Sequence, residues 1–262
     1  MALLHVDCYS QVLSMEMQMD VILPEATRGQ IGMEGRSGGE KWKTLYLLHG
    51  MSDDHSIWQR RTSIERYAAD KGIAVVMPTT HLGWYTDMYR GPKYFTYITD
   101  ELPKVCRQMF PNMSDKREDT YAAGLSMGGY GALKCGLRAP HVFSKVASLS
   151  GGLFDKSLIK DRSKDNSLWY DIFGPADEFT GAFNDLYAAA TEMKSSAIRP
   201  DVYIWCGTED FLYKYNVKMR NHLKKLKYNL VYEESPGDHQ WKYWDEKIQT
   251  VLDWLIPGKE EA

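Results

Sequence analysis

The first part of the chain alternates apolar and polar residues, and the later parts hold short runs that are apolar throughout. Residues 4–8 and 15–21 alternate, which is typical of strands with one buried face, and the second of these ends before Pro24. Two neighbouring strands of this kind predict an antiparallel start to a sheet. The unbroken runs predict strands buried on both faces, as in a parallel sheet, at residues 44–48, 73–78, 121–123, 146–149, 202–206 and 230–233.

Apolar residues recur at helical spacing between these runs, over residues 63–71, 95–109, 212–226 and 241–255. Pro103 is expected to kink the second of these helices or to start a new turn there, because proline has no N–H to donate. Strands that alternate with helices predict an α/β architecture. We therefore expect one α/β domain over residues 1–262, with a mostly parallel central sheet flanked by helices.

The stretch from 153 to 198 is the least regular part of the chain. It carries many aromatic residues among charged ones, at Trp169, Tyr170, Phe173, Phe179, Phe183 and Tyr187. We expect a helical insertion that covers the functional site as a cap and shapes the choice of substrate.

Composition narrows the classes of protein to consider. The 262 residues carry a net charge of −3, so nothing points to nucleic acid or to an acidic membrane surface as a partner. The chain shows neither an apolar stretch of membrane-spanning length nor a secretion signal. The four cysteines form no C-x-x-C pair, which fits a reducing compartment. We therefore expect a soluble cytoplasmic protein.

The strongest chemical signal is the motif Gly124-Leu125-Ser126-Met127-Gly128, which follows an apolar run and precedes a helical pattern. A strand, a sharp turn and a helix are the context in which such a motif exposes a nucleophilic serine. The two glycines would make room, because side chains at those positions would collide across the turn. We therefore expect Ser126 to be a nucleophile rather than part of a packed glycine-rich loop.

A serine nucleophile needs a histidine to take its proton and a carboxylate to hold that histidine in the right tautomer. In sheets of this class the order along the chain is serine, acid, histidine, each on a loop after a strand. Ser126, Asp210 and His239 meet that order, and both partners follow apolar strands. Glu209 and Asp238 are rival acids, although Asp238 is the neighbour of the base and would have to turn back on it.

The strand at 44–48 ends in His49-Gly50-Met51, where hydrolases of this kind place half of the oxyanion hole. We expect the backbone N–H groups of Met51 and Met127 to be the two donors. His49 itself is expected to brace the loop. The acids and histidine at 53–55 could be read as a metal cluster, but a solvated loop with helix-capping acids is the better interpretation, because no further ligands appear at metal spacing. We expect no metal.

The aromatic loop at 79–91 follows a predicted strand, which is where α/β sheets bind ligands. Its side chains could line an acyl or aryl pocket, or they could equally pack the loop down. The candidate substrate-contacting residues are Trp84, Tyr85 and Met88, together with Trp169 from the expected cap.

Several stretches together resemble the esterase D group of α/β-hydrolases, and more closely its bacterial tributyrin-esterase branch. They are Leu47-Leu48-His49-Gly50-Met51, Thr86-Asp87-Met88, Gly124-Leu125-Ser126-Met127-Gly128-Gly129, Cys206-Gly207-Thr208-Glu209-Asp210-Phe211-Leu212 and Gly237-Asp238-His239-Gln240-Trp241. The group also includes S-formylglutathione hydrolases, feruloyl esterases and mycolyltransferases. The resemblance covers nearly the whole chain and implies a carboxylesterase with no metal or organic cofactor.

The expected function is hydrolysis of small-molecule esters with short acyl groups, from acetyl to butyryl, through an acyl-enzyme. An aryl ester such as a ferulate could occupy the same pocket. The alternatives are a thioesterase acting on S-formylglutathione, an acyltransferase, and a non-catalytic binding protein on a hydrolase fold. The sequence leaves open whether the chain forms a homo-oligomer.

Overall fold

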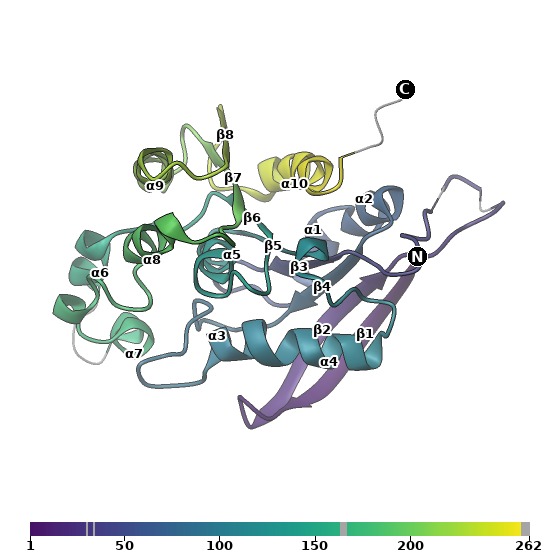
Figure 1. Ribbon diagram of the computed structural model, residues 1–262, viewed down its shortest axis with the longest axis horizontal. Helices are drawn as coiled ribbons and strands as arrows, with labels where there is room; N and C mark the ends of the chain where they lie inside the picture. The colour runs from purple at the N-terminus through teal and green to yellow at the C-terminus, as the bar shows by residue number, and fades with distance from the viewer. Residues whose placement is uncertain (30, 34, 163–166, 258–262) are drawn as a thin grey trace.

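The structure is a computed structural model that describes residues 1–29, 31–33, 35–162 and 167–257. Its centre is an eight-stranded sheet with the order β1-β2-β4-β3-β5-β6-β7-β8 (Figure 1). The strands are β1 (Ala2–Ser10), β2 (Met15–Leu23), β3 (Thr44–Leu48), β4 (Ala74–Pro78), β5 (Thr120–Leu125), β6 (Lys145–Leu149), β7 (Asp201–Gly207) and β8 (Leu230–Ser235).

Strand directions follow the predicted pattern. β1 and β2 form an antiparallel hairpin, β2 is antiparallel to β4, and every later pair is parallel. β3, β4 and β5 are buried at every position, which is why they are apolar without alternation. The mostly parallel sheet with an antiparallel start is confirmed.

Helices cover both faces of the sheet. One apolar cluster joins it to α4 (Leu102–Met109), α5 (Met127–Arg138), α8 (Leu186–Glu192) and α9 (Tyr213–Lys225). A second cluster joins its other face to α1 (Ile57–Arg61), α2 (Ile64–Lys71) and α10 (Trp241–Leu255). These two layers place the carboxyl ends of the parallel strands at one edge, where the loops of the site meet.

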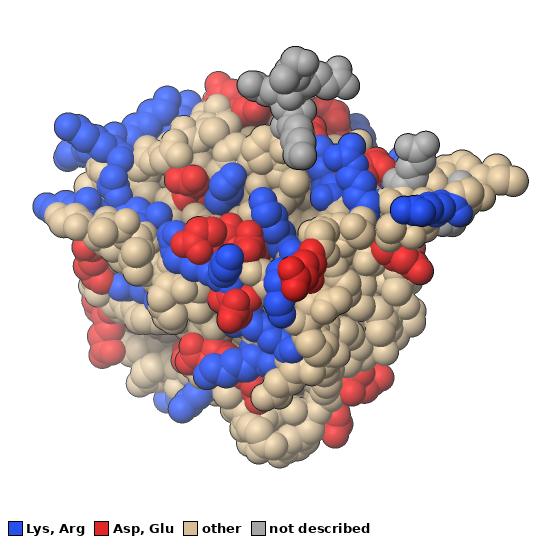
Figure 2. Space-filling model, turned by 45° about the vertical axis from the view of Figure 1, so that its right-hand side comes forward, with Lys and Arg blue, Asp and Glu red and all other residues tan. Residues whose placement is uncertain are grey.

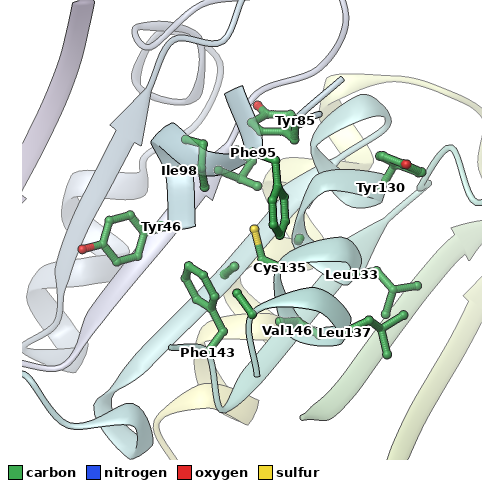
Figure 3. Packing of buried hydrophobic residues seen from close by; sticks show 14 of the residues in the cluster. Tyr46, Tyr85, Phe95, Ile98, Tyr130, Leu133, Cys135, Leu137, Phe143 and Val146 are labelled. Atoms are coloured by element: carbon green, nitrogen blue, oxygen red, sulfur yellow. The ribbon is translucent and has the colours of Figure 1, made fainter. Parts of the chain in front are cut away.

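Helix α5 runs through the middle of the larger cluster and is buried at every residue except Arg138. Figure 3 shows its apolar side chains together with Phe143, which lies beside Tyr46 of β3. The two rings meet edge to face, with centroids 5.8 Å apart. A helix held this firmly gives the turn before it a fixed position.

The helical stretch predicted at 95–109 is interrupted at its middle. A short α3 (Tyr94–Thr96) leads into a π-helical segment η1 (Tyr97–Glu101), and Pro103 is the second residue of α4. Proline cannot donate to the carbonyl of residue 99, and the wider π turn accommodates this missing bond. The expectation that Pro103 starts a new turn is confirmed.

The described residues of the segment 153–198 contain short helices between β6 and β7, on the left of the sheet in Figure 1. These are α6 (Lys156–Arg162), α7 (Leu168–Phe173), η3 (Ala176–Glu178), α8 and η4 (Met193–Ser195). One further turn, η2 (Arg117–Asp119), precedes β5.

Lysine and arginine side chains alternate with aspartate and glutamate over the middle of the face in Figure 2.

Candidate active site

Ser126 lies on the tight turn between β5 and α5. Its φ of 53° and ψ of −114° put it in a region that residues other than glycine rarely adopt. Its N–H donates to the Leu149 carbonyl over 2.9 Å, and its carbonyl accepts the N–H groups of Gly152 and Tyr130 at 2.9 and 3.2 Å. These bonds to the neighbouring strand, loop and helix hold the strained turn in place.

The two glycines of the motif are required by close packing. A Cβ atom on Gly124 would lie 2.5 Å from the carbonyl oxygen of Gly128, and one on Gly128 would lie 2.4 Å from that of Leu48. Both distances are far shorter than any real carbon–oxygen contact. The expectation that these glycines make room across the turn is confirmed.

His239 and Asp210 reach Ser126 from two other loops. His239 lies between β8 and α10, and Asp210 lies between β7 and α9. The Ser126 hydroxyl is 3.0 Å from Nε2 of His239, and Nδ1 of the same ring is 2.8 Å from Oδ2 of Asp210. The other oxygen of Asp210 accepts the N–H of Leu212 over 2.8 Å, and this side chain is fully buried. The carboxylate therefore fixes the ring with Nδ1 protonated and Nε2 free to accept a proton.

The rival acids make other contacts. The carboxylate of Glu209 accepts the N–H of Gly237 and the hydroxyl of Thr208. Asp238 accepts from the side-chain amide of Gln240 over 2.5 Å. Of these three acids, Asp210 is the one hydrogen-bonded to the histidine ring.

The loop after β3 lies against the turn of Ser126. His49 is buried in it, with Nδ1 2.7 Å from the Gly50 carbonyl and Nε2 accepting the N–H of Thr80 over 2.9 Å. Burial lowers the pKa of His49 to about 4, so the ring is neutral near pH 7. His49 braces the loop, as expected. Met51, two residues after His49, lies at the rim of the site and is 43% exposed.

A cavity of about 540 Å³ opens beside Ser126 and His239. Its walls are mainly apolar, as in most small-molecule sites. They are formed by Trp84, Phe154, Leu158, Trp169, Phe211 and Trp241. Asp53 and Arg162 are the charged side chains of opposite sign that line it within the described residues, and burial raises the pKa of the Asp53 carboxyl. A serine within hydrogen-bonding distance of a histidine thus faces a mostly apolar cavity.

Residues 10–255 match the family described as "Putative esterase". The chain belongs to this esterase family. The match spans the sheet from the end of β1 to the last residue of α10, and it includes every residue of the site described above.

Individual relatives agree with the family. An acetyl esterase of Caldicellulosiruptor saccharolyticus is 30% identical over 97% of this chain and 98% of its own. The fluorophosphonate-binding serine hydrolase F of Staphylococcus aureus, solved with substrate bound, is 32% identical with a TM-score of 0.87, and the match covers 98% of this chain and 99% of that one. An S-formylglutathione hydrolase of the same organism is 32% identical with a TM-score of 0.83. The match covers 97% of this chain and 98% of that one. The protein is a carboxylic ester hydrolase with the α/β-hydrolase fold, and its resemblance to the esterase D group is confirmed.

The structure divides the four predicted substrate-contacting residues of this esterase into two pairs. Trp84 and Trp169 line the cavity, with ring centroids 5.1 Å apart. Tyr85 and Met88 do not line it. Tyr85 is fully buried and donates from its hydroxyl to the His49 carbonyl over 2.9 Å, while Met88 packs against Gly91. The expectation for Tyr85 and Met88 is therefore corrected, because their side chains point into the fold and serve to pack the loop.

Sequence reasoning missed several cavity residues of the esterase. Phe154 follows β6 and packs on Trp84 with ring centroids 5.2 Å apart, and Phe211 lies tilted against the His239 ring with centroids 4.6 Å apart. Phe211 follows Asp210 directly, and an aromatic residue next to the predicted acid is the sequence signal for its place at the site. The spacing over residues 241–255 predicts Trp241 only as the start of the last helix, yet its side chain also lines the cavity.

Within the described residues, no group of three or more histidine, cysteine, aspartate or glutamate side chains could hold a metal ion. Asp54 instead accepts both the N–H and the hydroxyl of Ser56, just before α1 begins. No helix in the described part of the chain is both long and apolar enough to cross a membrane.

Proposed function

We propose that this esterase hydrolyses small-molecule esters with short acyl groups, through an acyl-enzyme formed on Ser126. The observation that carries the proposal is the hydrogen-bonded series from Ser126 through His239 to Asp210 at the wall of an apolar cavity. The strained turn presents the hydroxyl to this cavity, and the buried carboxylate orients the base.

In the first half of the reaction, Ser126 Oγ attacks the ester carbonyl while Nε2 of His239 takes the hydroxyl proton. Asp210 stabilises the imidazolium that forms, and the ring then gives the proton to the departing alcohol. In the second half, His239 takes a proton from the water that attacks the acyl carbonyl. The ring returns this proton to Ser126 Oγ as the bond between that oxygen and the acyl carbon breaks and the acid leaves. The Phe211 ring lies tilted against the imidazole of His239, with centroids 4.6 Å apart.

The negative oxygen of each tetrahedral intermediate needs two donors at fixed positions. We assign these to the backbone N–H groups of Met51 and Met127. Met127 is the first residue of α5, so its N–H has no carbonyl one turn earlier to bind, and the helix dipole adds positive potential there. Met51 belongs to the loop that packs on the turn, where a Cβ on Gly50 would lie 3.8 Å from Ser126 Cβ.

The acyl group would occupy the apolar part of the cavity. Trp84, Phe154 and Trp169 pack on one another there, with ring centroids 5.1 to 5.4 Å apart. We propose that the segment 153–198 acts as a cap, because it supplies the second and third of these rings. A mutually packed wall limits the depth of the site and favours acetyl to butyryl groups.

An aryl ester is a second candidate substrate, because the same aromatic rings would stack on a ferulate-like acyl group. A thioester is a third, since one structural neighbour is an S-formylglutathione hydrolase. We also propose a reducing, cytoplasmic setting, which the four free cysteines favour.

Two measurements test the proposal. A fluorophosphonate probe should label the wild type covalently and leave Ser126→Ala unlabelled, whereas a non-catalytic binding protein would not be labelled at all. A panel of p-nitrophenyl esters from acetate to laurate, with methyl ferulate and S-formylglutathione, should show its highest kcat/KM at two to four acyl carbons. Addition of an acceptor alcohol would reveal acyl transfer as a second product.

A further inference from the structure

The apolar cavity beside Ser126 carries two charged side chains, Asp53 and Arg162, on different elements. Asp53 belongs to the loop after β3, and Arg162 is the last residue of α6. The reaction steps described above use neither of them. A charge beside an apolar wall is costly unless it meets a partner, so each of the two points to a contact with the fold or with a ligand.

Asp53 is explained by the loop that carries it. Its N–H donates to the Gly50 carbonyl over 3.3 Å, which closes a turn in which Ser52 has a φ of 69°. Burial raises the pKa of the Asp53 carboxyl, and a hydrogen bond from the Gly50 backbone counteracts part of this rise. The Asp53 side chain therefore stabilises the turn that carries Met51, one of the two proposed oxyanion donors.

Arg162 makes no comparable contact with the fold. The Ser167 hydroxyl donates to its backbone carbonyl over 3.2 Å, and its guanidinium carbon lies 5.5 Å from the centroid of the Trp169 ring, which also lines the cavity. No ion pair engages Arg162 within residues 1–29, 31–33, 35–162 and 167–257. The N–H donors of the guanidinium can therefore bind a group that enters the cavity.

The spacing along α6 explains why Arg162 faces the cavity. Leu158 and Arg162 are four residues apart, so they lie on the same face of the helix, and both line the cavity. Lys160 lies between them in sequence, is exposed and does not line the cavity. Because Arg162 is exposed as well, its guanidinium stands at the outer end of the apolar wall that Leu158 and Trp169 form.

The proposed reaction divides the cavity into an alcohol side and an acyl side. His239 gives its proton to the departing alcohol, so the alcohol lies near this ring. The rings of Phe211 and Trp244 flank it there, with centroids 4.6 and 4.8 Å from that of the imidazole. The acyl group lies against the aromatic wall that includes Trp169, and Arg162 extends this wall outward.

We propose that Arg162 selects esters whose acyl group ends in a carboxylate, that is, half-esters of short dicarboxylic acids such as succinic and glutaric acid. This inference rests on the esterase function proposed above. The methylene groups of the acyl chain lie along Leu158 and Trp169, and both carboxylate oxygens bind the planar guanidinium. Hydrolysis follows the same two steps, consuming one water and releasing the alcohol and the dicarboxylic acid.

The position of Arg162 also keeps the energetic cost of binding a carboxylate small. A carboxylate of this kind is ionised at pH 7. At an exposed guanidinium it retains part of its hydration, whereas a charge taken fully into the apolar cavity would lose it.

A carboxylate on the alcohol side is disfavoured by Asp53. A Cβ atom on Gly50 would lie 3.0 Å from Oδ2 of Asp53 and 3.8 Å from Cβ of Ser126, so the Asp53 carboxyl group is close to the nucleophile. The loop of Asp53 leads into α1, where the Trp58 ring packs on Trp241 of the alcohol side with centroids 5.1 Å apart. Two carboxyl groups at such a site cannot both ionise without cost.

Matched pairs of unactivated esters test the proposal on the wild type. Monoethyl succinate and monoethyl glutarate are each compared with the ester in which an amide replaces the carboxylate at nearly the same shape. For at least one pair, kcat/KM of the half-ester should exceed that of the amide by about tenfold or more, as expected for a charge-assisted hydrogen bond. This ratio should fall when the salt concentration rises from about 0.01 M to 1 M, because salt screens an exposed ion pair.

Two variants of α6 locate the effect. Arg162→Gln should bring the ratio of half-ester to amide close to one. The matched control is Lys160→Gln, which removes the same charge from the same helix away from the cavity and should keep the wild-type ratio. A wild-type ratio near one, a ratio that survives in Arg162→Gln, or an equal loss in Lys160→Gln would overturn the proposal. Circular dichroism checks that both variants are folded.

A further pair separates the two sides of the cavity. The acetyl ester of 3-hydroxypropanoate carries its carboxylate on the alcohol side, and it should react more slowly than the corresponding amide. The opposite preference would place the bound carboxylate on the alcohol side and contradict the role given to Arg162.

Hydrolysis of p-nitrophenyl acetate distinguishes failure of this inference from failure of the proposed function. If the wild type hydrolyses p-nitrophenyl acetate but prefers no half-ester to its amide, the selection by Arg162 is refuted and the esterase function stands. If it hydrolyses no ester and the fluorophosphonate probe does not label it, the proposed function fails and this inference fails with it.

Discussion

Glu209 and Gly237 are joined by two hydrogen bonds that tie the loop after β7 to the loop after β8. The backbone N–H of Glu209 donates to the Gly237 carbonyl over 3.0 Å, and the N–H of Gly237 donates to the Glu209 carboxylate. This second bond, with help from the Thr208 hydroxyl, lowers the pKa of the Glu209 carboxyl. Asp210 and His239 stand next to this junction, so it sets how far apart the acid and the base lie.

The two neighbouring acids should therefore respond very differently to amide substitution. Asp210→Asn should lower kcat by about 10⁴, because an amide leaves His239 in the wrong tautomer. Glu209→Gln should cost much less, since its amide oxygen can still accept the N–H of Gly237. The kcat values for p-nitrophenyl acetate decide between them, and the reverse ranking would make Glu209 the acid.

Ser126→Ala should lower kcat by several orders of magnitude, and His239→Ala should do nearly as much, because the two groups act as one unit. Ser126 borders the cavity and its hydroxyl makes no bond to the core, so the thermal midpoint Tm should change little. Steady-state kinetics and calorimetry on the same samples measure both. Substantial esterase activity in Ser126→Ala would refute the assignment of the nucleophile.

Acyl-chain length should have a sharp optimum. Each methylene that fits the cavity gains up to about 0.8 kcal/mol of burial, so kcat/KM should rise from acetate to butyrate and then fall. Trp169→Ala should move the optimum to longer chains by opening the wall beside Trp84.

Met88→Ala is the matched control for that variant, because Met88 belongs to the same aromatic loop as Trp84 but does not line the cavity. It should leave the optimum unchanged. An optimum at twelve or more carbons in the wild type would contradict a closed pocket.

Lys134 should make stability depend on pH. It is fully buried on α5, with Nζ 2.6 Å from the side-chain oxygen of Asn184 and 4.7 Å from the centroid of the Phe95 ring, and burial lowers its pKa to about 7. Above pH 7 the folded protein holds this amine neutral, whereas the unfolded chain still binds the proton. The unfolded state therefore binds more protons between about pH 7 and the ordinary lysine pKa near 10.4, and stability rises with pH across that window.

The measurement compares the free energy of unfolding of the wild type and Lys134→Met at several pH values. The free energy of unfolding of the wild type, minus that of Lys134→Met, should increase as pH rises from 7 to 9. The slope of this difference should approach about 1.4 kcal/mol per pH unit. Because both proteins contain the same other titrating groups, the contributions of those groups to the pH dependence cancel in this difference. A difference that is constant with pH would mean that Lys134 stays charged in the fold.

The order of strands and helices was predictable because each depends on local periodicity. For example, a few consecutive residues are enough to predict the strand at 44–48 and the turn at the Gly-x-Ser-x-Gly motif. The family resemblance rests on such local stretches, and the match over residues 10–255 agrees with it. The π-helical segment Tyr97–Glu101 was not predictable in kind, since Pro103 signals only that a regular hydrogen bond is missing.

By itself, the sequence determined that the protein is an α/β-hydrolase, and it singled out Ser126, Asp210 and His239 as a set. Only the tertiary structure decided which aromatic side chains border the cavity. Trp84 and Tyr85 are neighbours that both adopt positive φ, near 50°, yet one lines the cavity and the other is buried in the core. The residue types in that loop do not by themselves require such a backbone. Contacts with α5, the His49 carbonyl and the segment 153–198 hold it there. In an irregular loop, contacts with distant parts of the chain set the direction of each side chain. In a strand or helix, the regular backbone sets it, so the spacing of the residues along the sequence predicts it.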